Sequence, residues 1–396
     1  MNRFLFPIFF FGVASLLFSV PVLRRSFYLV AVVLLLVIWG KREAARGLRI
    51  DLNLNRGSGF PGDDLFVVIH LANCSFFPLF WLAVYQSFPE QLGAGREQVL
   101  VSLGPREKKE KKIVFRGRRR GIYTLPDIRI TFGDAWGIGE ESFLQPCTER
   151  IVIYPKVVPV YGLYLERHIP FGPHQILFGL HEDPSRLRGC REYRAGDGLK
   201  RIHWPNMART GRVQVKEWET TLNAEIGIFL NLREEDFPVS EWFSLVELEI
   251  ELAASLIHRL VEKGEHVSFY ANGKAYAEER GKVFRLPVKN GRGQRKKVLT
   301  YLAGVTTAAE SPYEIFFQEA KETAAGACLL FITPRVTSEM VKRAGDLRKA
   351  GYHPFFLRPH FKKAVLPVKE LKEKNIPCFT VERKREDDAI LLAPQV

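Results

Sequence analysis

Cysteine is scarce in this chain, with five residues among 396 and no C-x-x-C spacing. Five is few and odd in number for a disulfide framework, and a structural zinc site typically has closely spaced cysteine pairs, so the sequence argues against both. Internal repeats and low-complexity segments are also lacking, and a hydrophobic content of 46% excludes a disordered chain. We therefore expect reduced thiols and more than one domain with a core of its own.

Two apolar runs lie near the start of the chain, at residues 4–23 and 27–40, separated by three polar residues. A signal peptide would have one short apolar region followed by a cleavage site. The pattern instead predicts a transmembrane helical hairpin over residues 1–46. The second run would span about 21 Å as a helix, less than the hydrocarbon core of about 30 Å, so Arg25 and Lys41 would extend it by snorkelling.

Basic residues near the ends of the two runs favour an orientation with both ends inside the cell. This predicts a two-pass protein of the cell membrane with cytoplasmic domains. The net charge is +14, and much of it lies in "REKKEKKIVFRGRRRG", residues 106–121. This stretch could contact an anionic membrane, bind nucleic acid or form a solvated hairpin loop between strands.

Apolar and polar residues alternate with a period of two in several segments after residue 47. This period is typical of strands with one buried face. The segments are 48–54, 65–71, 99–103, 113–115 and 128–132. Short strands at such spacing predict a β-sandwich over residues 47–157.

Strands alternate with helices from residue 223 onward. The apolar run "AEIGIFLNL", residues 224–232, is typical of a parallel strand buried on both faces. A helix with a broad apolar face follows, and Gly264 would cap its C-terminus. Further strands are expected at 266–270, 327–333, 353–357 and 378–381, with helices near 338–350 and 363–374. The order predicts a doubly wound, Rossmann-like α/β domain over residues 223–396.

Residues 158–222 contain the stretch "REYRAGDGLKRIHWPNMARTGR", and "RRRGIYTL" and "DAWGIG" precede it. With these motifs the chain resembles the bacterial domain of unknown function 58 family. The resemblance rests mainly on Arg191, Tyr193, Gly196, Asp197, Arg201, Ile202, Trp204, Ala208 and Arg209. It implies that the last domain is von Willebrand factor A-like, and that the chain acts beside MoxR-type AAA+ ATPases or transglutaminase-like proteins.

Metal-binding von Willebrand factor A domains end their first strand in Asp-x-Ser-x-Ser, whose oxygens suit Mg²⁺. This chain has Asn231, Arg233 and Glu235 at those places, and Pro334 where a later acid of the family would stand. The guanidinium of Arg233 offers only donors and a positive charge, so it repels a cation. We therefore expect no metal and no other cofactor, although the acidic run 234–236 could hold a cation loosely.

The motif in residues 158–222 allows three interpretations. Cys190, His203 and Asp197 have the residue types of a nucleophile, its base and an orienting acid, but composition does not supply geometry. Arginines with Tyr193 and Trp204 could bind nucleic acid, although interspersed acids argue against it. We favour a third interpretation, in which Asp197 accepts hydrogen bonds from arginines and Trp204 is a buried anchor on the α/β domain. The donors would be one or more of Arg191, Arg194, Arg201 and Arg209, Gly196 fits a tight turn beside Asp197, and His203 would be a buried or half-buried residue with a structural hydrogen bond. The network could be purely structural or could also present surplus arginines to a partner.

The sequence thus predicts a membrane-anchored, cytoplasm-facing interaction protein that docks a protein partner such as a MoxR-type ATPase. It supports no enzymatic activity. An envelope-associated enzyme that uses the Arg/Asp/His-rich motif is the first alternative. A nucleic-acid-binding membrane protein is the second, and nucleic acid is the less favoured partner.

Overall fold

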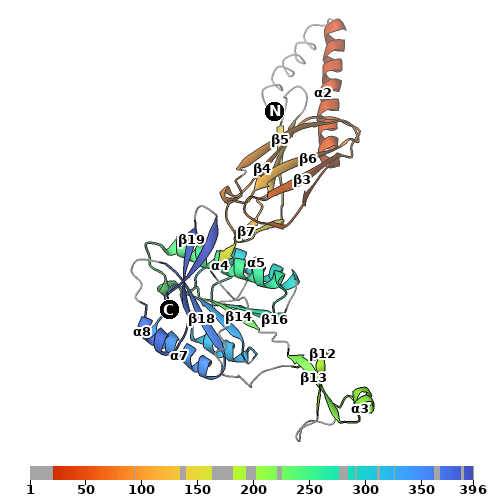
Figure 1. Cartoon of the computed structure of the whole chain (residues 1–396). Helices are drawn as coiled ribbons and strands as arrows, with labels where there is room; N and C mark the ends of the chain where they lie inside the picture. The colour runs from red at the N-terminus through yellow and green to blue at the C-terminus, as the bar shows by residue number, and fades with distance from the viewer. Residues whose placement is uncertain are drawn as a thin grey trace. The chain divides into compact units, whose positions relative to one another are not determined.

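The computed structural model of the chain describes twelve segments, which comprise 21–93, 95–133, 140–162, 182–192, 202–220, 225–275, 284–289, 292–309, 313–324, 326–360, 366–384 and 388–395. Two compact units contain them, Met1–Lys156 and Val157–Val396 (Figure 1). Each unit is described separately below.

Helix α2 (Pro21–Gly47) runs without a break through the place where a loop between two apolar runs was expected. The first run, up to residue 20, lies outside the described residues. None of the helices in the described part of the chain combines the length and the apolar character that a membrane crossing requires. The apolar stretch of α2 would cover only about 21 Å of a core of about 30 Å, and charged residues flank it. The predicted membrane hairpin and the predicted two-pass membrane localisation are therefore wrong.

The first unit is a β-sandwich. One sheet has the order β1-β3-β6 and another has the order β5-β4-β8-β9. The strands are β1 (Leu48–Leu54), β3 (Asp64–Asn73), β4 (Leu79–Ser87), β5 (Arg96–Leu103), β6 (Lys108–Arg116), β8 (Ile128–Gly133) and β9 (Glu140–Gln145). A small third sheet joins β2 (Ser58–Gly59), β10 (Arg150–Ile153) and β7 (Gly121–Thr124), and a turn of 3-10 helix, η1, spans Glu90–Leu92.

The inward residues of both larger sheets share one hydrophobic core. In β3 every second residue from Leu65 to Asn73 is buried, which is the period that the alternation indicated. Phe132 of β8 and Leu82 of β4 are fully buried in the same core. The basic stretch of residues 106–121 is mostly strand β6, which stands at the end of its sheet's order and carries Lys108, Lys109, Lys111 and Lys112.

The second unit is built on an eight-stranded sheet of order β11-β20-β19-β18-β17-β14-β15-β16. Five consecutive strands of this order, from β19 to β15, pair in parallel. The strands are β11 (Val160–Tyr161), β14 (Ile226–Leu230), β15 (Val267–Ala271), β16 (Phe284–Lys289), β17 (Cys328–Ile332), β18 (His353–Pro359), β19 (Cys378–Lys384) and β20 (Ala389–Pro394). Strand β14 lies inside this parallel set, between β15 and β17, and the chain adds strands on both sides of it, which is the doubly wound arrangement.

Helices cover both faces of this sheet (Figure 1). Helices α4 (Trp242–Glu262) and α5 (Arg292–Gly304) lie on one face, and α7 (Ser338–Lys349) and α8 (Val368–Glu373) lie on the other. The aromatic core on the second face also includes α6 (Glu314–Glu319), which η4 (Ala320–Glu322) follows. Every residue of β14 is buried, because both of its edges are paired and both of its faces are covered.

A small antiparallel ribbon of β12 (Glu182–Glu192) and β13 (Gln214–Thr220) carries the short helix α3 (Trp204–Thr210). Ile202 and Val215 are buried and form an isolated β-bridge at the end of the ribbon that carries α3. We call the described part of this element, residues 182–192 and 202–220, the arm. No residue of α3 is buried.

Candidate functional site

The strand order of the α/β sheet reverses beside β14, because β15 lies on one side of it and β17 on the other. Ligands of doubly wound sheets bind at such a point, outside the carboxyl ends of the strands. The three expected degenerate positions, Asn231, Arg233 and Glu235, follow the carboxyl end of β14 directly.

Buried amide and hydroxyl groups join the carboxyl ends of β14, β15 and β17. The amide nitrogen of Asn231 donates to the Asp236 carboxylate at 2.8 Å and to the Thr333 hydroxyl at 3.1 Å. The amide nitrogen of Asn272 donates to the side-chain oxygen of Asn231 at 2.8 Å, and its oxygen accepts from the backbone of Leu232 at 2.6 Å. Asn231 therefore holds three strands together and has its polar atoms engaged within the protein.

Arg233 and Glu235 form an ion pair with each other. The backbone of this turn is fixed by Ala308, whose carbonyl accepts from the amide of Glu234 at 3.1 Å and whose amide donates to Leu232 at 3.0 Å. Within the described residues, no group of three or more His, Cys, Asp or Glu side chains could hold a metal ion. The guanidinium of Arg233 therefore supplies the positive charge beside the acidic turn.

Two carboxyl groups near this turn are shifted toward their neutral forms. Burial raises the pKa of Asp236, and the hydrogen bond from Asn231 and the charge of Arg233 oppose that rise. Burial also raises the pKa of Glu249 on α4 well above its usual value, and the negative charge of Asp236 adds to the rise. Neither carboxyl oxygen of Glu249 has a hydrogen-bond partner in the described structure.

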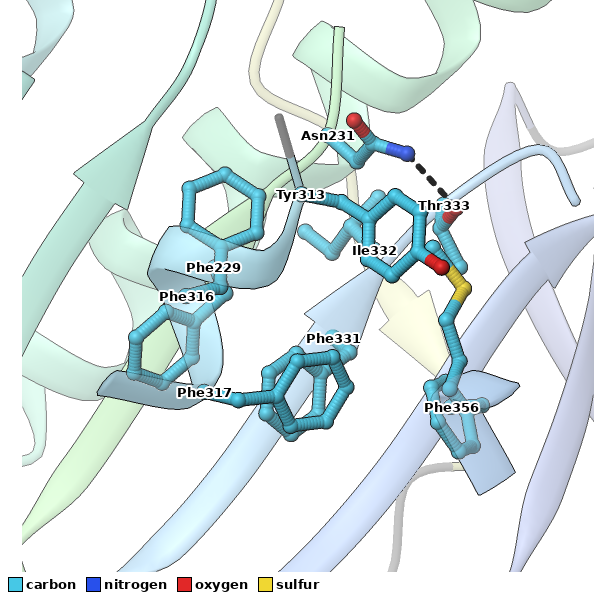
Figure 2. A pocket seen from close by; sticks show the side chains of 10 residues that line it. Phe229, Asn231, Tyr313, Phe316, Phe317, Phe331, Ile332, Thr333 and Phe356 are labelled. Carbon is cyan, nitrogen blue, oxygen red and sulfur yellow. Dashed lines mark hydrogen bonds between the residues drawn. The ribbon is translucent and has the colours of Figure 1, made fainter. Parts of the chain in front are cut away.

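A cavity of about 10 Å³ lies beneath Asn231 and Thr333. Rings of Phe229, Phe316 and Phe331 gather around it, and the amide of Asn231 points to Thr333 at one side (Figure 2). This is room for about one water molecule, whereas small-molecule sites are on the order of 300–1,000 Å³. The cavity is therefore a packing defect of an aromatic core and not a substrate pocket.

The loop from η3 (Glu234–Asp236) into α4 exposes two large apolar side chains among acids. Val239 is 97% exposed and Phe243 is 55% exposed. Five acids and no lysine or arginine lie from Glu234 to Glu247, in a chain whose net charge is +14. We call this surface the β14–α4 patch; it comprises Glu234, Glu235, Val239, Glu241 and Phe243. The exposure of these apolar side chains depends on tertiary packing, so no local pattern in the sequence indicates it.

Of the motif residues that the structure describes in the arm, Trp204, Ala208 and Arg209 are exposed, Arg191 and His203 are half-buried, and Ile202 is buried. Trp204 is 65% exposed, so its expected role as a buried anchor is wrong. It is the first residue of a short helix on a two-stranded ribbon, which offers too little surface to cover an indole. Arg209 is exposed, and Arg191 donates to the carbonyl of Glu192 at 3.2 Å. Tyr193, Arg194, Gly196, Asp197 and Arg201 lie outside the described residues, so the network around Asp197 stays a prediction.

His203 is half-buried and is the N-cap of α3. Its Nδ1 accepts a hydrogen bond from the backbone of Asn206 at 3.1 Å. Cys190 lies in β12, paired in register with Lys216. One ring nitrogen of His203 is thus engaged in a local structural bond, and the third residue of that set, Asp197, lies outside the described segments.

A family model described as "Protein of unknown function DUF58" matches residues 189–328. The match includes the arm motif, β14 and the β14–α4 patch. It supports the resemblance for this part of the chain; helix α2 and the β-sandwich lie outside it. No curated protein matches the chain.

Solved structures with similarity to the chain have low TM-scores. A CARDB domain from Pyrococcus furiosus, solved with two metal ions, has 16% identity, covers 27% of this chain and 91% of its own, and has a TM-score of 0.21. A β-glucosidase from Listeria innocua has 14% identity, covers 27% of this chain and 16% of its own, and has a TM-score of 0.15. An exo-β-N-acetylglucosaminidase from Vibrio harveyi has 10% identity, covers 83% of this chain and 71% of its own, and has a TM-score of 0.20. These values carry no argument about function.

Proposed function

We propose that the chain is a protein-interaction protein that docks a partner on the β14–α4 patch, and that the partner is a MoxR-type AAA+ ATPase. The finer resemblance to a von Willebrand factor A domain belongs to this proposal, and the order β16-β15-β14-β17-β18-β19 supports it. The match to residues 189–328 supports the family resemblance, and the choice of ATPase as the partner comes from that resemblance alone.

The observation that carries the proposal is the exposure of Val239 and Phe243 at the switch point of the sheet. Side chains of Asn231, Asn272 and Thr333 bond one another there, so little polar capacity is left for a small ligand. Large apolar side chains surrounded by charged ones are typical of a protein interface. The patch therefore suits a protein surface better than a metabolite.

Affinity capture of the full-length chain tests this proposal. The parent should retain an AAA+ ATPase at constant stoichiometry, identified by mass spectrometry and by ATP hydrolysis in the eluate. Phe243→Ala should weaken the complex about 30-fold or more, since loss of an interface anchor costs about 2 kcal/mol or more. Leu144→Ala, which truncates a similarly exposed side chain in β9, is the matched control. Equal retention by Phe243→Ala and the control would contradict the assigned surface.

A further inference from the structure

The arm presents an aromatic and basic surface opposite in character to the β14–α4 patch. Trp204 and Val213 are exposed on it, as are Arg209 and Arg212. Residues 202–216 contain Arg209, Arg212 and Lys216 and no acid, whereas Glu192 on β12 pairs with Arg212 and Glu217 and Glu219 lie farther along the ribbon. The basic part of the arm is therefore the end that carries α3. Tryptophan and arginine are the residue types most enriched among the anchors of protein interfaces.

Local bonds fix the shape of this surface. The His203 cap and the bond from the amide of Gly211 to the carbonyl of Met207, 2.9 Å long, hold both ends of α3. Arg212 pairs with Glu192 across the ribbon at 2.8 Å, which ties the turn after α3 to β12. Trp204 is therefore presented from an ordered helix, so docking it costs less conformational entropy than docking a free chain.

The two surfaces complement each other in charge and in apolar content. The patch has exposed Val239 and Phe243 bordered by glutamates, and the arm has exposed Trp204 bordered by arginines. Such complementarity steers two surfaces together and fixes their orientation. Among the described surfaces of the chain, the arm complements the patch best in charge and apolar content.

Chain connectivity favours the arm of another copy. The arm joins β14 at its amino end through residues 221–225, which reach at most about 20 Å. The patch begins beyond the opposite end of β14, which is itself about 16 Å long. Trp204 precedes β13 and so lies at the end of the ribbon remote from this junction. To reach its own patch, the arm would have to turn back along the full length of β14.

We propose that the arm of one copy docks on the β14–α4 patch of a second copy, with Trp204 against Val239 and Phe243 and Arg209 facing Glu241. The inference rests on the proposed function for the identity of the docking surface, and it adds a regulation, because a docked arm excludes the ATPase. The contact joins two different surfaces, so it propagates head to tail.

Sedimentation equilibrium of the purified full-length chain measures this contact. The parent should self-associate as concentration rises, and added salt should weaken the association because charged surfaces are screened. Trp204→Ala should weaken it about 30-fold or more. Arg129→Glu, an exposed charge reversal in β8, is the control and should change nothing.

A mixture of two variants tests the head-to-tail geometry. Trp204→Ala damages the arm and keeps an intact patch, whereas Phe243→Ala damages the patch and keeps an intact arm. At a concentration where the parent associates, each variant alone should therefore stay monomeric. Mixed together, they should form a one-to-one dimer that grows no further. Arg209→Glu or Glu241→Arg alone should weaken the association. A chain that carries both changes should recover part of it, because the two charges are then opposite again.

Three results would overturn the inference. These are a parent that stays monomeric at all concentrations, self-association that Trp204→Ala leaves intact, and a variant mixture that gives no dimer. Failure of the proposed function can be distinguished from failure of this inference, because ATPase capture depends on Phe243 and not on Trp204. Under both proposals Trp204→Ala captures at least as much ATPase as the parent.

Discussion

Glu249 is 1% exposed on α4, and neither of its carboxyl oxygens has a hydrogen-bond partner within the described structure. Burial holds its pKa well above the usual value. In the folded chain the carboxyl thus keeps its proton at a pH where the unfolded chain has lost it. The folded state binds more protons in that window, so stability is lost as pH rises from the ordinary glutamate pKa toward the raised one.

We predict that Glu249→Leu stabilises the chain. An unsatisfied buried polar group costs about 1–3 kcal/mol, and leucine has a similar volume without that cost. The gain should be small at about pH 4 and larger at about pH 8, because only the parent must retain a proton there. Urea unfolding at both pH values measures it. Glu373→Leu, an exposed change on α8, should stay within about 0.5 kcal/mol; an equal gain there would contradict the assignment.

Single secondary-structure elements differ in how well the sequence predicts them. Strand β1 has the bounds that alternation indicated, Leu48–Leu54, because one face is buried and the other is solvated. Strand β4 was missed, since "LFWLAVY" has no alternation and short apolar runs do not separate strand from helix. Helix α2 was misjudged because the helix continues through the charged residues that suggested a loop.

The candidate site was predictable in position but not in character. The sequence placed Asn231, Arg233 and Glu235 directly after a buried strand, and the switch point follows from strand order. The hydrogen bonds among Asn231, Asn272 and Thr333 join strands 40 residues or more apart in the chain, so no local pattern reveals them. The exposure of Trp204 likewise cannot be predicted from a local pattern, because it depends on which residues of the arm pack against α3.

The turn after β14 gives a prediction about cations. Asn231→Asp replaces the donor to Asp236 with a second carboxylate at 2.8 Å, so like charges should lower the thermal midpoint of the variant. Mg²⁺ should restore part of the loss by neutralising the pair, and it should leave the parent unchanged. Calorimetric titration provides the second measurement. A saturable Mg²⁺ site in the parent would show that Arg233 does not exclude the ion.

At the scale of the whole molecule, each unit has its own hydrophobic core. Phe132→Ala removes a fully buried ring from the first unit and should cost it about 3–5 kcal/mol. Hydrogen exchange by mass spectrometry, read separately for peptides of β3 and of β17, should show a larger loss of protection in the first unit. Phe229→Ala, which removes a ring stacked 4.8 Å from Tyr270, should give the reverse. Equal losses in both units would contradict independent cores.

The lysines of β6 should protect the chain against aggregation at high concentration. A strand at the end of a sheet offers unpaired backbone groups to any other extended chain, and lysines on it repel such an approach. Lys108, Lys109, Lys111 and Lys112 place four positive charges along this strand. Chemical acetylation of these amines would leave the sandwich core untouched and remove the repulsion. The first visible result should be slow precipitation into fibrous, β-rich aggregates that native charge prevents.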